Sequence, residues 1–346
     1  MQGAIYLDLE RDSDLRKLSD PELFFGAQGE ALICLDEIQQ RPELFTVLRS
    51  ILDETGRPGQ ILLLGSASPE LIRQNSETLA GRIAYLELTP FMLTELPKAA
   101  TSLRTHWLRG GFPRSLLAQD DGPSLEWRLQ FIRTFVERDL PQLGISTPAA
   151  TTRRFWQMCA HLHGQVLNRS KLGGSLGVSH TTVSKYLDAL TQTFVVRRLD
   201  AFASNLGKRL VKSPKIYIRD SGILHALLHI DSYNMLLGHP TFGHSWEGYV
   251  IENVLAKAGA HWQASHYRAS SGAELDLILE RGTRRIAIEC KASAAPGVTR
   301  GFWTACKDLN VEHAWVVAPI EGESYPIAKN VTVIGLSELL RSTAFD

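Results

Sequence analysis

Two acidic residues, Asp36 and Glu37, directly follow the apolar run of residues 31–35. A continuous apolar run of this length is typical of a strand that is buried on both faces of a parallel sheet. Open α/β sheets bind their ligands outside the carboxyl ends of the strands. An aspartate at that position can hold the Mg²⁺ of a bound nucleotide, and the next acid can orient a water molecule. The alternative is a buried strand that ends in solvated acids.

A second group with the residue types of a catalytic site contains Asp276, Glu289 and Lys291. These residues lie on two strand-like segments, residues 273–279 and 285–291. The order of an Asp strand, a Glu-x-Lys strand, a helix and a further strand resembles the restriction-endonuclease-like fold and its PD-(D/E)-x-K motif. The resemblance implies that Asp276 and Glu289 hold Mg²⁺, which steadies the attacked phosphate and its water. It also implies that the lysine aids the nucleophile or the developing charge.

A helix over residues 245–255 precedes these strands and carries Glu247, which matches the helix glutamate of that motif. The resemblance therefore implies four catalytic residues: Glu247, Asp276, Glu289 and Lys291. The proline that precedes the aspartate of the motif is absent, since Leu275 stands at that position. Because the fold also persists in inactive members, both an active and an inactive site stay open.

The segment between the two strands predicts their register. Gly282 and Thr283 can form a two-residue hairpin loop of type II′, which makes Asp276 the direct partner of Glu289. Directly paired residues point to the same face of a sheet, and the period of two adds Lys291 to that face. Two opposed carboxylates repel each other unless a cation lies between them. We therefore expect the two carboxylates within about 6 Å of each other, within reach of one bridging metal ion.

The elements around the first acidic pair follow an alternating pattern. Strand-like segments cover residues 4–10, 60–64 and 82–88, and residues 42–55 have apolar positions at helical spacing. Strands that alternate with helices predict a parallel sheet. Ser66 follows one of these strands, and a small polar side chain there could touch a γ-phosphate or its water.

Four short motifs in this region occur in a specific order: Leu-Asp-Glu-Ile-Gln at 35–39, Leu-Gly-Ser-Ala-Ser at 64–68, Leu-Ala-Gly-Arg at 79–82 and Leu-Thr-Pro-Phe at 88–91. The series resembles the prokaryotic AAA-type ATPases that carry a C-terminal domain of unknown function, and the resemblance covers nearly the whole chain. It implies that Asp36 and Glu37 form the Walker B motif, with Asp36 as a Mg²⁺ ligand. It also implies that Ser66 lies near the sensor position and Arg82 near the nucleotide. ATP and Mg²⁺ are the cofactors of the complete family.

The Walker A motif of such ATPases, G-x-x-x-x-G-K-[ST], has no match in the sequence. That loop supplies the backbone N–H groups and the lysine that bind the phosphates. We therefore expect that this chain, as it stands, does not hydrolyse ATP. Either an N-terminal segment is missing or the ATPase has decayed, and the intact order of the other motifs favours a missing segment. In the strand order of the family that the chain resembles, the strand of that segment lies between segments 60–64 and 82–88, which we therefore expect not to pair with each other.

Residues 168–190 have the pattern of a helix-turn-helix motif. A glycine lies at the turn between two short helices, and Ser179 is a suitable N-cap for the second helix. The residues that would face outward and reach phosphates or base edges of DNA are Ser179, His180, Thr181, Ser184 and Lys185. No arginine on this helix could read guanine, so any DNA contact is expected to be weakly sequence-specific. The alternative is a rigid connector or a protein-binding module.

These patterns together predict an α/β protein of four parts. The parts are a partial P-loop-type parallel sheet (1–95), a helical lid (96–150), a winged-helix domain (151–239) and a C-terminal restriction-endonuclease-like α/β domain (240–346).

The composition is that of an ordinary soluble protein, with 44% apolar and 21% charged residues. No apolar run approaches the length of a membrane span and the N-terminus is no signal peptide, so we expect a cytoplasmic protein without a membrane partner. The four cysteines are scattered, which favours reduced thiols over disulfides or a zinc site. The net charge of zero implies no global attraction to nucleic acid. DNA would have to bind through the winged helix and the C-terminal domain, and a homo-oligomer stays open.

Three functions stay open from the sequence. The first is an AAA-type ATPase family member whose C-terminal half is an accessory module. The second is a Mg²⁺-dependent DNA endonuclease whose ATPase half is regulatory. The third is a non-catalytic scaffold that binds DNA or a partner. The first rests on the longest resemblance.

Overall fold

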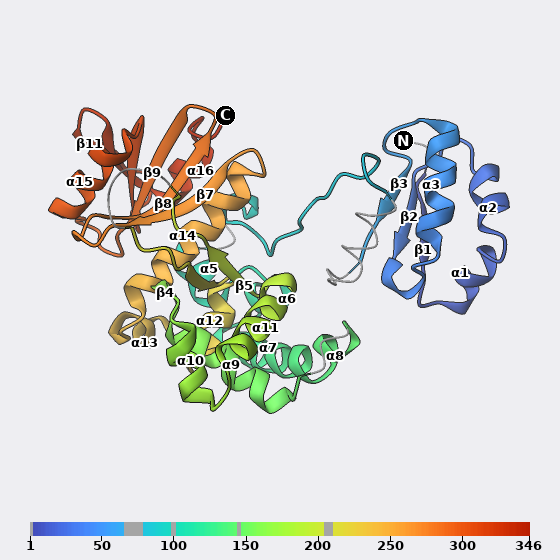
Figure 1. Cartoon of the computed structure of the whole chain (residues 1–346), viewed down its shortest axis with the longest axis horizontal. Coiled ribbons are helices and arrows are strands. Elements are labelled where there is room, and N and C mark those ends of the chain that lie inside the picture. The colour runs from blue at the N-terminus through green and yellow to red at the C-terminus, as the bar shows by residue number, and fades with distance from the viewer. Residues whose placement is uncertain (1–2, 66–78, 98–101, 144–146, 204–209) are drawn as a thin grey trace. The chain divides into compact units, whose positions relative to one another are not determined.

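The computed structural model describes residues 3–65, 79–97, 102–143, 147–203 and 210–346 (Figure 1). The chain divides into two compact units, Met1–Glu87 with Gln142–Ile145 and Leu88–Pro141 with Ser146–Asp346. The first unit carries the acidic pair that follows the apolar run. The second unit carries the acidic group near the C-terminus.

A three-stranded parallel sheet forms the centre of the first unit, in the order β1-β2-β3. The elements are β1 (Ile5–Asp8), α1 (Asp12–Lys17), α2 (Pro21–Ala27), β2 (Ile33–Asp36), a 3₁₀ turn (Ile38–Gln40), α3 (Leu44–Thr55) and β3 (Ile61–Leu63). Leu7 and Leu35 pair across β1 and β2, and both are buried together with Phe45 of α3. Tyr6 points to the other face, where it is 53% exposed. The expected parallel α/β arrangement is confirmed.

Residues 82–88 form no strand, so the expectation of a strand there is wrong. Leu86 and Leu88 are 92% and 98% exposed. An extended segment becomes a strand only when a neighbour pairs with its backbone, and β3 forms its described ladder with β2 alone. Within the described residues, segments 60–64 and 82–88 do not pair with each other, as expected.

A six-stranded mixed sheet forms the centre of the C-terminal region, in the order β11-β12-β10-β9-β8-β7. The elements are α14 (Phe242–Ala258), β7 (Gln263–Arg268), β8 (Glu274–Arg281), β9 (Arg284–Cys290), α15 (Arg300–Leu309), β10 (His313–Ala318), β11 (Ser324–Ala328), β12 (Val331–Gly335) and α16 (Leu336–Arg341). Strand β10 is parallel to β9 and β12, and the other pairs are antiparallel. Phe302 of α15 belongs to the same buried hydrophobic cluster as Ile278 of β8 and Ala287 of β9. Trp246 of α14 donates its indole N–H to the Val317 carbonyl of β10 at 3.1 Å.

The predicted hairpin between β8 and β9 is confirmed. The ladder pairs Arg281 with Arg284 next to the turn, so Gly282 and Thr283 are the two loop residues. Gly282 has a φ of 62°, as the first residue of a type II′ turn requires.

Helices and a small antiparallel sheet precede this domain. The elements are a 3₁₀ turn (Leu93–Glu95), α5 (Leu103–Arg109), α6 (Pro113–Leu116), α7 (Asp121–Thr134), a π-helical turn (Phe135–Asp139), α8 (Leu140–Gln142), α9 (Ala149–His161), β4 (Gln165–Val166), α10 (Arg169–Leu176), α11 (His180–Gln192), β5 (Val196–Leu199), β6 (Lys215–Ile218), α12 (Ser221–Leu227) and α13 (Tyr233–Gly238). The small sheet has the order β4-β6-β5.

Buried hydrogen bonds join these helices to the C-terminal domain. His106 of α5 bonds to the Tyr249 hydroxyl at 2.7 Å, and His225 of α12 bonds to the Ser245 hydroxyl at 2.8 Å. The Trp107 indole N–H donates to the same serine at 2.9 Å. Helix α14 is therefore anchored to the preceding helices, and the second unit packs as one body.

All four cysteines are free thiols, as expected. Within the described part of the chain, no helix has the length and apolar character needed to cross a membrane.

Candidate functional site

The acidic group of the C-terminal domain lies where β8 and β9 stop pairing. The ladder ends at Leu277 and Ile288, one step before the expected pair of Asp276 and Glu289. Asp276 Oδ2 instead accepts a hydrogen bond from the Cys290 N–H at 3.0 Å, in place of a carbonyl of β8. The expectation of a ladder pair is corrected to this extent, but the Asp276 carboxylate is still held against β9.

Glu289 and Lys291 come from the end of β9 and lie side by side. The Lys291 N–H donates to the Val317 carbonyl of β10 at 3.0 Å, which fixes the backbone there. Lys291 Nζ lies 2.6 Å from Glu289 Oε1. Glu289 Oε2 is buried and has no hydrogen-bond partner among the described residues. Glu289 therefore has one carboxylate oxygen that is paired with Lys291 and one that has no partner among the described residues.

Lys215 of β6 extends into this group from the small antiparallel sheet. Its Nζ lies 2.9 Å from Glu247 Oε1, 3.2 Å from Glu274 Oε1 and 3.2 Å from Asp276 Oδ1. The ammonium donates hydrogen bonds to Glu247 and Asp276 and forms an ion pair with Glu274, whose other oxygen lies 3.8 Å from the Arg268 guanidinium. Burial by itself lowers the pKa of Lys215, but the three carboxylates outweigh it and the pKa is raised. The 3% exposed lysine therefore stays charged.

Glu247 enters the group from α14 and is held by three side chains. Tyr217, on the same face of β6 as Lys215, donates its hydroxyl to Glu247 Oε1 at 2.6 Å. His244 Nδ1 lies 3.2 Å from Glu247 Oε2. Burial raises the pKa of Glu247, but Lys215, His244 and Tyr217 bring it down to about 2. The glutamate is therefore ionised at neutral pH.

Asp276 and Glu289 are the acids of the group that lack sufficient positive charge. Burial, followed by the negative charge of Glu247, raises the pKa of Asp276. Burial, followed by the negative charge of Asp276, raises the pKa of Glu289. The two carboxylates therefore interact, although the 6 Å limit on their separation stays a prediction. A further cation beside both of them would stabilise their ionised forms.

The structure brings together all four residues that the sequence proposes for catalysis: Glu247, Asp276, Glu289 and Lys291. Sequence patterns did not single out Lys215, Tyr217 or Glu274. The alternation in residues 215–218 could have placed the lysine and the tyrosine on one face, and the same period places Glu274 beside Asp276. Lys215 lies in a basic stretch, residues 197–219, that suggests a solvated surface.

Asp36 and Glu37 lie at the carboxyl end of β2, where the sequence places them. The Tyr6 hydroxyl donates to Asp36 Oδ2, and this hydrogen bond raises the pKa of Tyr6 to about 12. The Glu37 N–H donates to Asp36 Oδ1 at 3.0 Å. Glu37 has a φ of 55°, an uncommon value for a residue other than glycine. Both oxygens of Asp36 therefore accept hydrogen bonds from the protein itself.

The other two residues predicted for the nucleotide site are Ser66 and Arg82. Ser66 lies outside the described residues. The Arg82 guanidinium pairs with Asp53 in the last turn of α3 and donates to the Ala80 carbonyl at 3.0 Å. Helix α3 leads from the carboxyl end of β2 to the amino end of β3, so Asp53 lies towards the sheet edge opposite Asp36.

The residues predicted for DNA contact lie at the start of α11. The Ser179 hydroxyl accepts the Thr182 N–H at 3.1 Å, which confirms the expected N-cap. The Ser184 hydroxyl is turned back to the His180 carbonyl at 3.2 Å. The exposed members of the group are Ser179, His180, Thr181 and Lys185.

An open groove of about 540 Å³ lies beside this helix start. Its lining residues are Val166, Leu167, Asn168, Arg169, Ser170, His180 and Ser213. Arg169 donates to the Ser184 hydroxyl at 3.3 Å, so its guanidinium lies next to α11. The starts of α10 and α11 therefore border one groove.

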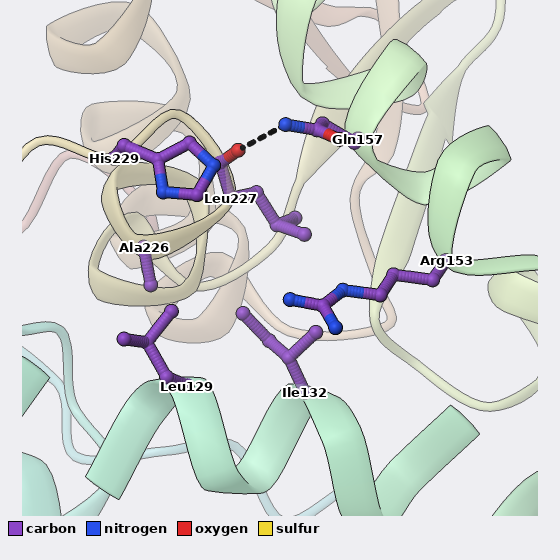
Figure 2. Close-up of a pocket in the computed structure, with 7 residues that line it drawn as sticks. All are labelled: Leu129, Ile132, Arg153, Gln157, Ala226, Leu227 and His229. Carbon is purple, nitrogen blue, oxygen red and sulfur yellow. Dashed lines mark hydrogen bonds between the residues drawn. The ribbon is translucent and has the colours of Figure 1, made fainter. Parts of the chain in front are cut away.

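A smaller pocket lies where α7, α9 and α12 meet, as Figure 2 shows. Leu129 and Ile132 of α7 face Ala226 and Leu227 of α12 across it. The Gln157 side chain donates to the Leu227 carbonyl at 3.3 Å. A volume of about 30 Å³ has room for a water molecule but is too small for a nucleotide or a base.

We expect the substitution Lys215→Met to destabilise the second unit by about 3–5 kcal/mol, because three carboxylates lose the cation that they share. Methionine keeps a similar length and the apolar stem. All seven tryptophans lie in this unit, so urea unfolding followed by tryptophan fluorescence, with a chelator present, measures its stability.

Lys212→Met is the matched control, because Lys212 is exposed on the same segment. It should change the free energy of unfolding by no more than about 0.5 kcal/mol. A loss below about 1 kcal/mol for Lys215→Met would contradict the account of this lysine.

Family models match three consecutive parts of the chain. An AAA domain matches residues 1–97, a domain of unknown function (DUF8612) matches residues 100–234, and a second domain of unknown function (DUF4143) matches residues 242–339. No solved structure matches the chain.

Two curated relatives match almost the full chain. They are uncharacterised proteins of Mycobacterium bovis and Mycobacterium tuberculosis. Each is 41% identical over 340 residues, which is 98% of this chain and 76% of the relative. The chain therefore belongs to the family of these mycobacterial proteins, an AAA-type ATPase-like family with a C-terminal domain of unknown function.

Proposed function

We propose that the C-terminal domain of this AAA-type ATPase-like protein cleaves DNA phosphodiester bonds with Mg²⁺. The observation that carries the proposal is the grouping of Asp276, Glu289 and Lys291 at the end of the β8–β9 pair, with Glu247 beside them. The order α14, β8, β9, α15, β10 agrees with a restriction-endonuclease-like fold.

The charges of the group favour a divalent cation. Four carboxylates (Glu247, Glu274, Asp276 and Glu289) lie among two ammonium groups (Lys215 and Lys291), and the Arg268 guanidinium lies 3.8 Å from Glu274 Oε2, which leaves one negative charge when all are ionised. Protonation of His244, whose pKa is raised by its hydrogen bond to Glu247, would balance that charge, and with a neutral His244 the excess remains. Burial makes such an excess costly unless a cation balances it.

The residues present fit Mg²⁺ in its usual mode of binding. Mg²⁺ keeps several waters and takes one or two protein carboxylates plus substrate phosphates. Among the described residues, no group of three or more His, Cys, Asp or Glu side chains has the arrangement of a metal cage. Asp276 and Glu289, with the unpartnered Glu289 Oε2, supply the smaller set. When bound there, Mg²⁺ would polarise a phosphate and activate a water.

The chain's own residues then have distinct tasks. The Cys290 N–H holds the Asp276 carboxylate in place at 3.0 Å. Lys291, whose side chain is 28% exposed, can approach a phosphate and stabilise the charge that develops on it. Glu289 Oε1 lies 2.6 Å from Lys291 Nζ and so holds the ammonium beside the acidic group.

We expect the full chain to cleave DNA with Mg²⁺ and to lose about 10²-fold of this activity or more in Asp276→Asn and in Glu289→Gln. Both substitutions keep the side-chain volume and remove the charge. The matched control is Glu280→Gln, which makes the same chemical change on β8, where Glu280 pairs with Arg285 outside the group. The measurement is the initial rate of cleavage of labelled duplex and single-stranded DNA.

A second candidate function is a non-catalytic scaffold, and the observation that favours it is the Lys215 ammonium between Glu247 and Asp276. In a scaffold the lysine would only neutralise the acids. Absence of Mg²⁺-dependent cleavage in the wild-type chain, or equal rates in wild type and Asp276→Asn, would favour the scaffold and overturn the nuclease.

The segment from α9 to β6 has features that support a proposal of DNA binding. The order α9, β4, α10, α11, β5, β6 agrees with a winged helix. The exposed His180, Thr181 and Lys185 can contact the phosphate backbone from the start of α11, and Arg169 borders the same groove. Such contacts favour affinity over sequence specificity.

We expect Lys185→Ala to weaken binding to duplex DNA of any sequence and to reduce the slope of log K against log[salt] by about 0.9, because one phosphate contact is lost. Fluorescence anisotropy at several salt concentrations measures both. Lys257→Ala, at an exposed lysine near the end of α14, is the control and should change neither. Equal affinity and slope in Lys185→Ala would contradict a DNA contact by this helix.

The chain as it stands is proposed not to hydrolyse ATP. A dissociation constant near 1 μM needs about 8 kcal/mol of interaction, and the residues 1–346 contain no Walker A loop to supply it. Calorimetry should find no micromolar affinity for ATP with Mg²⁺ in wild type or in Asp36→Asn. Micromolar binding that disappears in Asp36→Asn would contradict this proposal.

A further inference from the structure

Lys215 is a fixed positive charge inside the acidic group. Its Nζ lies within 2.9–3.2 Å of one oxygen from each of Glu247, Glu274 and Asp276. The three carboxylates come from α14 and β8, whereas the lysine comes from β6. The 3% exposed ammonium donates hydrogen bonds to Glu247 and Asp276 and forms an ion pair with Glu274, so its charge is balanced by the protein itself.

Asp276 divides the group into two sides. Its Oδ1 faces Lys215 at 3.2 Å, and its Oδ2 accepts the Cys290 N–H. On the Lys215 side all the contacted carboxylates share the ammonium. On the other side lies Glu289, which is buried, bonds to Lys291 through Oε1 and leaves Oε2 without a partner among the described residues.

Two-cation phosphodiesterase sites place their ions about 3.5–4 Å apart, so that both contact the reacting groups. In this chain the Lys215 ammonium lies between carboxylates of two elements, as one such ion would. We propose that Lys215 takes the place of one divalent cation, so that the site has room for a single metal ion, on the Glu289 side of Asp276. The inference rests on the proposed Mg²⁺ site and adds the number of ions and the residue that sets it.

The source of the lysine has a consequence for the group. Lys215 and Tyr217 both reach Glu247 from β6, so the acids are neutralised only while the small sheet packs against α14. A cation that is covalently attached does not dissociate at low metal concentration. The carboxylates that contact Lys215, including Glu247, therefore stay ionised and paired with the ammonium in the absence of a metal ion.

The test counts bound Mn²⁺, used as the probe, by equilibrium dialysis with electron paramagnetic resonance of the free ion. We expect one Mn²⁺ in the wild-type chain and two in Lys215→Met, because the three carboxylates then need another cation. Lys212→Met, at the exposed lysine of the same segment, should bind one. Equal numbers in wild type and Lys215→Met would overturn the inference.

The stability of Lys215→Met adds a measurement that does not depend on activity. The melting temperature of this variant should rise with Mn²⁺ more than that of the wild type, because the added ion binds the folded state. The double variant Lys215→Met/Glu247→Gln should lose this extra rise. If Lys215→Met does not fold with or without Mn²⁺, the count in the wild type decides: one ion supports the inference and two overturn it.

The counts also separate this inference from the proposed function. One Mn²⁺ in the wild type and two in Lys215→Met, with no cleavage of DNA, would overturn the nuclease but support the inference, whereas no Mn²⁺ in the wild type would overturn both. One Mn²⁺ in both, lost in Glu289→Gln, would support the nuclease site and overturn the role of Lys215.

Discussion

A buried ammonium and three carboxylates depend on each other in the second unit. Lys215 could not remain charged away from water without Glu247, Glu274 and Asp276, and these acids could not lie together without the lysine. Removing one partner of a buried ion group typically costs about 3–5 kcal/mol. The contacts join β6, α14 and β8, so the acidic group forms only when the small sheet and the C-terminal domain fold against each other. Farther along α14, Glu252 forms a separate ion group in which one carboxylate pairs with two arginines, Arg197 and Arg219, the latter at 3.0 Å.

Local rules were sufficient to predict the strand pair that carries the candidate site. A Gly-Thr loop favours one turn type, and that turn fixes the register of β8 and β9. The same rules could not show that the ladder ends at Leu277, where a side chain takes over from the backbone. Lys215 was missed for a different reason. Strand periodicity defines its face, but the residues that cover that face lie 32 and 61 positions away in the sequence.

In the N-terminal unit, local sequence predicted one strand correctly and another wrongly. The apolar run before Asp36 predicted a buried strand correctly, because neighbours on both sides, β1 and β3, pair with it. Residues 82–88 have a similar composition but form no strand, since a ladder needs a partner that local sequence does not supply. Arg82 pairs with Asp53, a nearby contact that motif order alone could not reveal. Site residues are thus predictable where turns fix the register and unpredictable where distant elements meet.

The central claim is that one cation site of the acidic group is built from Lys215 and another is left for a metal ion. Anomalous diffraction from crystals of the full chain grown with Mn²⁺ tests it most directly. The account predicts one anomalous peak between Asp276 and Glu289, with the Lys215 ammonium still among Glu247, Glu274 and Asp276. A Mn²⁺ peak in place of the ammonium, or saturating Mn²⁺ with no peak at Asp276 and Glu289, would contradict it.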